Sequence, residues 1–119
     1  MLGFVRSRLG DVPDGTTDWD AALERAHTMR DRYGEAITLW QRARARLHAT
    51  RPDRATALAD LEAATTLFEA MEARPALARC LRDRSGVLRA MDRVAEAAEV
   101  GARAEKLAAE LGLKDFPGR

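Results

Sequence analysis

Apolar side chains recur at intervals of three and four residues in five consecutive segments of this sequence. Such spacing places them on one face of an α-helix and does not fit the alternation of a strand. Short breaks that contain glycine, proline or charged residues separate the segments. The pattern predicts five helices, over residues 18–32, 35–49, 53–72, 75–91 and 94–111. Because the breaks are short, we expect consecutive helices to lie antiparallel.

Composition supports an all-α fold. The chain of 119 residues has 24 alanines but only one isoleucine and five valines, and β-branched residues are the ones that favour strands. A hydrophobic fraction of 46% is typical of a folded domain rather than a disordered chain. We therefore expect one helical domain over residues 17–113, preceded by a flexible arm (1–16) and followed by a tail (114–119).

The sequence favours a cytoplasmic protein. A single cysteine, Cys80, excludes an internal disulfide and is typical of a reducing compartment. The first residues lack the apolar core of a signal peptide, and no segment approaches the roughly 18 apolar residues that a membrane span needs. Twenty basic and 19 acidic side chains give a net charge of +1, which argues against a strongly basic nucleic-acid-binding protein.

Small and apolar residues of the third helical segment recur in the fifth at a shift of 34 residues. The matched positions are Ala63, Leu67 and Ala70 with Ala97, Gly101 and Ala104. Between them, Leu81, Ser85 and Leu88 alternate large, small and large side chains along the fourth segment. Small residues let two helices approach closely, and large ones fill the space between them. A fixed period of this kind predicts a stacked helical repeat.

A period of 34 residues with this alternation resembles the tetratricopeptide repeat. The run from Leu81 to Arg93 is similar to a bacterial form of its first helix and turn, although Asp92 stands where that family usually has glycine. The block from Gly34 to Ala43 resembles the second helix of the repeat, out of phase. The resemblance implies antiparallel hairpins stacked into a short right-handed solenoid, like the arrays attached to bacterial signal-transducing ATPases, LuxR-type and cyclase-linked regulators. In that family, such arrays bind partner proteins, peptides or small inducers on a concave face.

Few side chains in this sequence are suited to catalysis or metal binding. His27 and His48 fall on different predicted helices, 21 residues apart, so they do not form a pair of metal ligands at helical spacing. Cys80 falls in the apolar row of the fourth segment, which favours a buried, unreactive thiol over a nucleophile. No phosphate-binding loop or hydrolase motif occurs. We therefore expect no enzyme activity, no metal and no cofactor.

Arginine residues cluster on the second helical segment with the turn after it, and on the fourth segment. Four of them are candidate partner-binding residues: Arg42, Arg46, Arg82 and Arg89. Two interpretations fit these clusters: a basic groove for an acidic peptide or a phosphate backbone, or a solvated surface with ion pairs within the helices. The net charge near zero and the absence of interleaved aromatic residues disfavour nucleic acid.

These features together predict a regulatory or interaction module that binds a partner protein or peptide on a helical concave face. The alternative is a helical dimerisation module, and a nucleic-acid-binding domain is the weaker third candidate. We also expect a homodimer, because the last predicted helix carries apolar residues that no later helix covers. These residues are Val94, Val100, Leu107 and Leu111.

Overall fold

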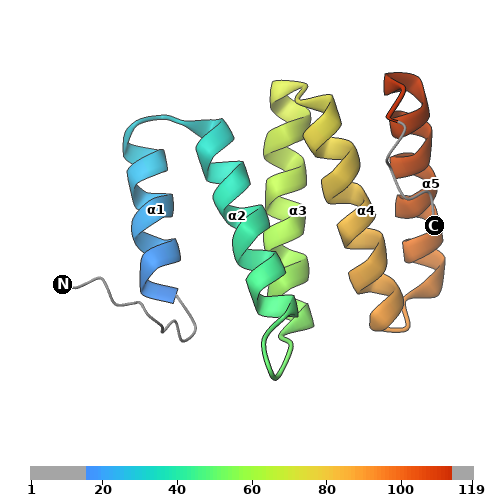
Figure 1. Cartoon of the computed structure of the whole chain (residues 1–119), viewed down its shortest axis with the longest axis horizontal. Helices are drawn as coiled ribbons and strands as arrows, with labels where there is room; N and C mark the ends of the chain where they lie inside the picture. Colours follow the sequence, from blue (N-terminus) through green and yellow to red (C-terminus); the bar gives the residue numbers. More distant parts are fainter. Residues whose placement is uncertain (1–15, 114–119) are drawn as a thin grey trace.

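The computed structural model describes residues 16–113, which contain five α-helices and no strand. The helices lie side by side in chain order, and each runs antiparallel to the one before it (Figure 1). They are α1 (Thr16–Thr28), α2 (Arg32–Leu47), α3 (Arg54–Met71), α4 (Arg74–Ala90) and α5 (Val94–Leu111). The predicted all-α fold is confirmed. The predicted arm up to residue 15 and the predicted tail from residue 114 lie outside the described residues.

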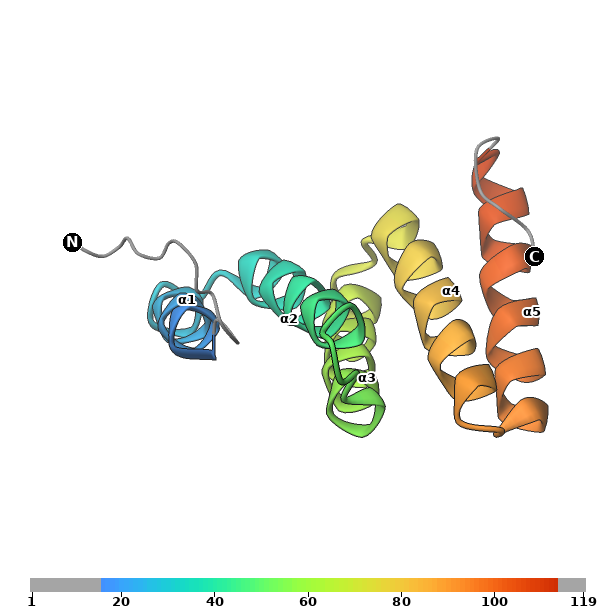
Figure 2. The ribbon, with the colours of Figure 1, turned by 60° about the horizontal axis from the view of Figure 1, so that its bottom comes forward.

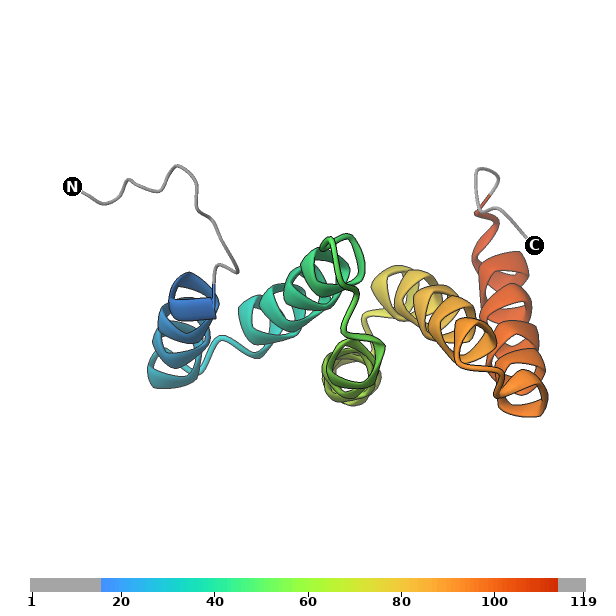
Figure 3. The same ribbon diagram turned by 90° about the horizontal axis from the view of Figure 1, so that it is seen from below.

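Each helix packs mainly against its neighbours in the chain. The most extensive pairings join α4 to α5 and α2 to α3, while α1 makes a smaller interface with α2 (Figure 2). Seen from below, α3 lies between α2 and α4 in the row but is displaced to one side of them, so that α2 and α4 share a face of the molecule (Figure 3). The molecule is elongated, with extents of 45 × 32 × 23 Å. Two hairpins, α2–α3 and α4–α5, therefore form the body of the fold, with α1 at one end.

The apolar core extends through α2, α3, α4 and α5. Its largest fully buried apolar side chains are Phe68 and Leu61 on α3 and Leu81 and Leu88 on α4. The apolar rows predicted for these two helices therefore face each other across the core. Because large buried side chains lose the most contact with water on folding, these four residues contribute strongly to the stability of the hairpins.

Small residues bring α4 and α5 close together, as the alternation along the fourth segment predicts. Ser85 is buried between Leu81 and Leu88, and its hydroxyl donates a hydrogen bond of 2.8 Å to the carbonyl oxygen of Ala97 on α5. A Cβ atom placed on Gly101 would lie 2.9 Å from Ser85 Oγ, closer than ordinary contact allows. The two helices thus pack tightly because Ser85 and Gly101 carry so few atoms.

Three connections end a helix with the same backbone turn. Arg30, Glu72 and Asp92 have positive φ angles of 56°, 58° and 63°. In each case the next residue donates a backbone hydrogen bond to the carbonyl five positions before it. Glycine usually supplies this left-handed residue, as Gly112 does at the end of α5. Non-glycine residues adopt it at a cost in conformational energy.

The first helix is shorter than the sequence predicts. It ends at Thr28 rather than residue 32, because the left-handed turn at Arg30 reverses the chain. Asp31 then caps α2 by accepting a hydrogen bond of 2.9 Å from the backbone N–H of Gly34. Gly34, predicted to mark the turn, therefore lies in the first turn of α2. Met29, which falls within the predicted first helix, follows the observed one and is 70% exposed.

The packing of α3 and α5 repeats at a shift that differs from the predicted 34 residues. The two helices begin 40 residues apart, at residues 54 and 94, and each buried residue of α5 corresponds to a buried residue of α3 at the same shift. Ala57, Ala64 and Phe68 of α3 match Ala97, Ala104 and Ala108 of α5. Ala63 and Ala70, which carry the 34-residue match, are exposed. Alanine occurs on both faces of these helices, so its recurrence does not by itself identify the buried face.

Helix α2 also differs from the predicted pairing. Its sequence resembles the second helix of a repeat, yet it packs most extensively against α3, the helix that follows it. It is therefore the first helix of the α2–α3 hairpin, and it occupies the same place in that hairpin as α4 does in α4–α5. Because α3 runs back between them, α2 and α4 point in the same direction (Figure 1).

Candidate functional site

A groove lies between the C-terminal halves of α2 and α4, beside the start of α3. Its volume of about 300 Å³ is at the lower end of the range of ligand pockets. Three apolar residues line it: Leu47, Val87 and Ala90. The remaining lining residues are Gly86 and five side chains that carry a charge or an imidazole. These five are Arg44, His48, Arg54, Arg82 and Asp83.

Helical spacing explains how these residues come together. Arg44 and Leu47 are three residues apart, so they share one face at the end of α2. On α4, Asp83, Gly86 and Ala90 share a face in the same way. The parallel direction of α2 and α4 places these two faces beside each other, which forms the two walls of the groove.

Helix α3 contributes Arg54, its first residue. A six-residue connection, residues 48–53, leads from α2 to this position. Asp53 caps the helix by accepting a hydrogen bond of 3.2 Å from the backbone N–H of Thr56. The cap fixes where α3 begins, and it therefore fixes the position of the Arg54 backbone at the edge of the groove.

Positive charge dominates the groove. Arg44 and Arg54 are exposed, and neither side chain forms an ion pair with another residue in the described part of the chain. Arg82 Nη2 lies 3.7 Å from Asp83 Oδ1, while Asp83 Oδ2 accepts a hydrogen bond of 2.7 Å from Trp40 Nε1. Three arginines against one aspartate give the lining a formal charge of +2.

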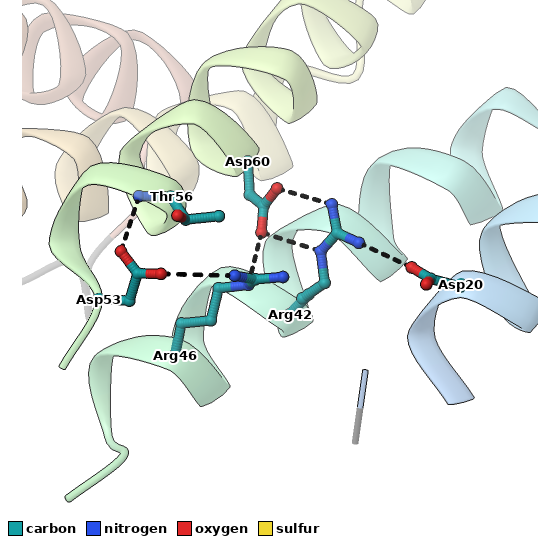
Figure 4. A network of polar contacts seen from close by, with 6 residues as sticks. All are labelled: Asp20, Arg42, Arg46, Asp53, Thr56 and Asp60. Carbon is teal, nitrogen blue, oxygen red and sulfur yellow. Dashed lines mark hydrogen bonds and ion pairs between the residues drawn. The ribbon is translucent and has the colours of Figure 1, made fainter. Parts of the chain in front are cut away.

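A second group of charges joins α2 to α3 (Figure 4). Arg42 donates to the carboxylate of Asp60 from Nε at 3.0 Å and from Nη2 at 2.8 Å. Arg46 lies one turn further along α2, and its Nε is 3.4 Å from Asp60 Oδ2. The Asp60 side chain is only 6% exposed. A buried carboxylate of this kind requires partners, and the two arginines supply them.

The same two arginines reach further acidic residues at the ends of this cluster (Figure 4). Arg42 Nη1 lies 3.3 Å from Asp20 on α1, and Arg46 Nη1 lies 3.7 Å from Asp53. The hydrogen bonds with Asp60 raise the pKa of Arg42 above its ordinary value, so this guanidinium stays charged. Arg42 and Arg46 therefore hold α1, α2 and α3 together.

The four predicted partner-binding arginines do not share one site. Arg42 and Arg46 form the cluster around Asp60, and only Arg82 lines the groove. Arg89 is exposed on α4 but is not among the residues that line the groove.

Neither the Asp60 cluster nor the combination of Arg44, His48 and Arg54 is predicted from the sequence. For Asp60 a signal exists, because the carboxylate stands between the apolar residues Leu58 and Leu61. An ionised side chain in an apolar row is rarely left without a partner. The groove residues come from three helices, so no local pattern in the sequence joins them.

Cys80 is buried, as the sequence predicts. Its thiol donates to the carbonyl oxygen of Leu61 at 3.6 Å, and Sγ lies 3.5 Å from the hydroxyl oxygen of Thr65. Burial raises the pKa of the Cys80 thiol to about 11. Because the thiolate is the reactive form of cysteine, this side chain is protonated at neutral pH and unsuited to nucleophilic attack.

The two histidines are exposed and lie in different hollows of the surface. His48 follows α2 directly and lines the groove. His27, in the last turn of α1, lines a separate hollow with Arg30, Arg32 and Glu35. Within residues 16–113, no group of three or more histidine, cysteine or carboxylate side chains is arranged to hold a metal ion.

No protein-family model, curated protein sequence or solved structure matches this chain. None of the helices in the described part of the chain has both the length and the apolar character that a membrane span requires.

Proposed function

We propose that this chain is a non-enzymatic interaction module that binds a segment of a partner protein in the α2–α4 groove. The observation that carries this proposal is the groove itself, in which Leu47 and Ala90 lie beside the exposed Arg44 and Arg54, which form no ion pair within the described residues. Protein interfaces combine an apolar centre with a polar rim in the same way. The small volume of the groove indicates that a short segment of the partner enters it.

Contacts with the core join the two walls of the groove, which supports this proposal. Trp40 on α2 bonds to Asp83 on α4, and its ring packs edge-on against Phe68 of α3 with centroids 5.9 Å apart. Phe68 is fully buried, so these contacts connect the walls to the core. A site built on rigid helices loses little conformational entropy when it binds, and this favours affinity.

As part of the same proposal, the hairpins α2–α3 and α4–α5 are tetratricopeptide-like units stacked as a short solenoid. Their first helices, α2 and α4, then line the face that such repeats use for binding. We further propose a regulatory role in the cytoplasm, which rests on the lone, buried Cys80 and on the resemblance of the run from Leu81 to Arg93 to the repeats of bacterial regulators.

Peptide display on the immobilised chain tests this function without assuming the chemistry of the partner. A random peptide library is selected against the wild type, against Gly86→Leu and against Ala98→Leu. A Cβ on Gly86 would meet no atom within 4 Å, so the leucine occupies open space in the groove without straining the fold. Ala98 is an exposed residue of α5, and its substitution controls for added apolar surface.

We expect the same peptides from the wild type and from Ala98→Leu, and their loss with Gly86→Leu. Because leucine favours helix more than glycine does, Gly86→Leu is expected to fold at least as stably as the wild type. Peptides that bind all three proteins equally, or no enrichment on any of them, would contradict the proposed function.

A further inference from the structure

The charge of the α2–α4 groove contrasts with that of the whole chain. The chain carries a net charge of +1, yet the groove brings three arginines to one aspartate. That aspartate, Asp83, already accepts a hydrogen bond from Trp40. The exposed guanidinium groups of Arg44 and Arg54 have no carboxylate partner in the described part of the chain. Their hydrogen-bond donors are therefore available to a ligand.

The apolar part of the groove limits what such a ligand contains. Leu47, Val87 and Ala90 lie among the arginines, and the neighbouring Gly86 leaves open space beside them. A purely ionic ligand would leave this apolar surface exposed to water. A ligand with an aliphatic side chain between carboxylates satisfies both parts of the lining at once.

From this combination we propose that the groove recognises an acidic partner segment in which one aliphatic residue is flanked by carboxylates. The inference rests on the proposed function and specifies the chemistry of the partner. Charge complementarity selects the acidic segment and speeds its association, and the aliphatic side chain fixes its position in the groove.

A single-stranded nucleic acid fits this groove less well. Such ligands stack their bases on aromatic side chains, and none of the described residues that line the groove is aromatic. A phosphate backbone also has no group that covers Leu47 and Ala90. An oligonucleotide therefore belongs in the experiment as a competing ligand.

Fluorescence anisotropy with three labelled probes tests the inference. The first is a peptide with one leucine and two glutamates on each side, the second replaces every glutamate by glutamine, and the third is an oligonucleotide of thymidines. We expect the acidic peptide to bind about tenfold more tightly than the glutamine peptide at low salt. The difference is expected to shrink at about 0.5 M salt, where exposed charges are screened.

Two variants locate the effect. The double variant Arg44→Gln/Arg54→Gln is expected to weaken the acidic peptide about tenfold and to leave the glutamine peptide unchanged. Arg89→Gln is the matched control, since Arg89 is an exposed arginine of α4 outside the groove lining. It is expected to leave the affinity for all three probes unchanged.

The outcomes separate this inference from the function on which it rests. Equal affinities for the acidic and glutamine peptides overturn the inference, and so does failure of both to bind while peptides from the display experiment still do. Tighter binding of the oligonucleotide, lost in the double variant, overturns it in favour of nucleic acid. The proposed function fails instead if the display experiment yields no peptide whose binding is lost in Gly86→Leu.

Discussion

Arg42 on α2 binds both oxygens of the Asp60 carboxylate on α3, at 3.0 Å from Nε and 2.8 Å from Nη2. The side chains are 16% and 6% exposed, and Arg46 approaches the same carboxylate from the next turn of α2. Removing one member of a buried ion pair leaves the other without compensation for its lost hydration. Asp60 is therefore a residue on which the α2–α3 hairpin depends.

Replacing this carboxylate is expected to destabilise the fold strongly. Asp60→Ala should lower the free energy of unfolding by about 3 kcal/mol, because it leaves Arg42 charged in a partly buried position. The double variant Arg42→Met/Asp60→Leu should lose much less, since it removes both charges and fills the space with apolar atoms. Urea unfolding followed by circular dichroism measures both values.

An exposed ion pair provides the control for this prediction. Arg74 and Glu110 lie 3.0 Å apart with about half of each side chain exposed, so Arg74→Ala should cost less than about 1 kcal/mol. Equal losses for Asp60→Ala and Arg74→Ala would mean that the Asp60 cluster contributes no more than a surface pair.

Asp92 offers a substitution that is expected to stabilise the protein. It adopts a φ of 63° between α4 and α5, a conformation that costs little only for glycine. Asp92→Gly should raise the free energy of unfolding by about 0.5 kcal/mol. The reason is that glycine removes the strain of the left-handed turn, and this gain exceeds the loss from the greater conformational entropy of the unfolded chain. Arg89→Gly, within helix α4, should lower it by about 1 kcal/mol. Equal losses from both glycines, measured by thermal unfolding, would rule out a left-handed turn at Asp92.

Cys80 makes stability depend on pH in the alkaline range. Its pKa is about 11 in the folded chain against an ordinary value of 9.0, so between these values the unfolded chain loses the proton and the folded chain keeps it. The free energy of unfolding should therefore fall as pH rises from about 9 to 11, by about 1 kcal/mol per pH unit. Below pH 9 both states are protonated and this contribution is constant.

The variant Cys80→Ala separates this effect from that of other titrating groups. Unfolding measured at several pH values should show a steeper alkaline decline for the wild type than for the variant. Parallel declines would mean that the thiol is as accessible to water in the folded chain as in the unfolded one.

The predicted homodimer depends on the last helix, α5. Val94 on α5 is 60% exposed, and Val100, Leu107 and Leu111 are half-buried. Light scattering coupled to size exclusion at micromolar concentration should give about twice the chain mass of 13.1 kDa if these residues meet a second copy. Under that condition Val94→Lys should return the mass to that of one chain. A mass of one chain for the wild type would contradict the dimer.

The sequence predicts the limits of individual helices better than the way in which the helices pack against one another. Helix α5 begins and ends at the residues that the apolar spacing predicts, because a regular row and the terminal Gly112 mark both limits. The end of α1 is missed, since no glycine signals the left-handed turn at Arg30. The repeat shift is missed because alanine fits a buried and an exposed face equally well, as Ala64 and Ala63 show.

The candidate site is also harder to predict than the single helices, because its residues come from distant parts of the chain. Arg44 and Arg82 are 38 positions apart in the chain, and their approach depends on the parallel alignment of α2 and α4. The sequence shows which residues are arginines, but not which ones a buried carboxylate engages. On α2, Arg42 and Arg46 pair with Asp60 of α3, whereas Arg44 of the same helix α2 lines the groove.

The most direct test of the α2–α4 groove as the binding site is amide chemical-shift mapping with a displayed peptide. A peptide recovered on the wild type is titrated into the isotope-labelled chain, and the shift of each backbone amide is recorded. We predict that the largest shifts fall on Leu47, Gly86, Val87 and Ala90, and that they disappear in Gly86→Leu. Shifts concentrated on α1 or on the outer side of α5, unchanged in that variant, would contradict a binding site between α2 and α4.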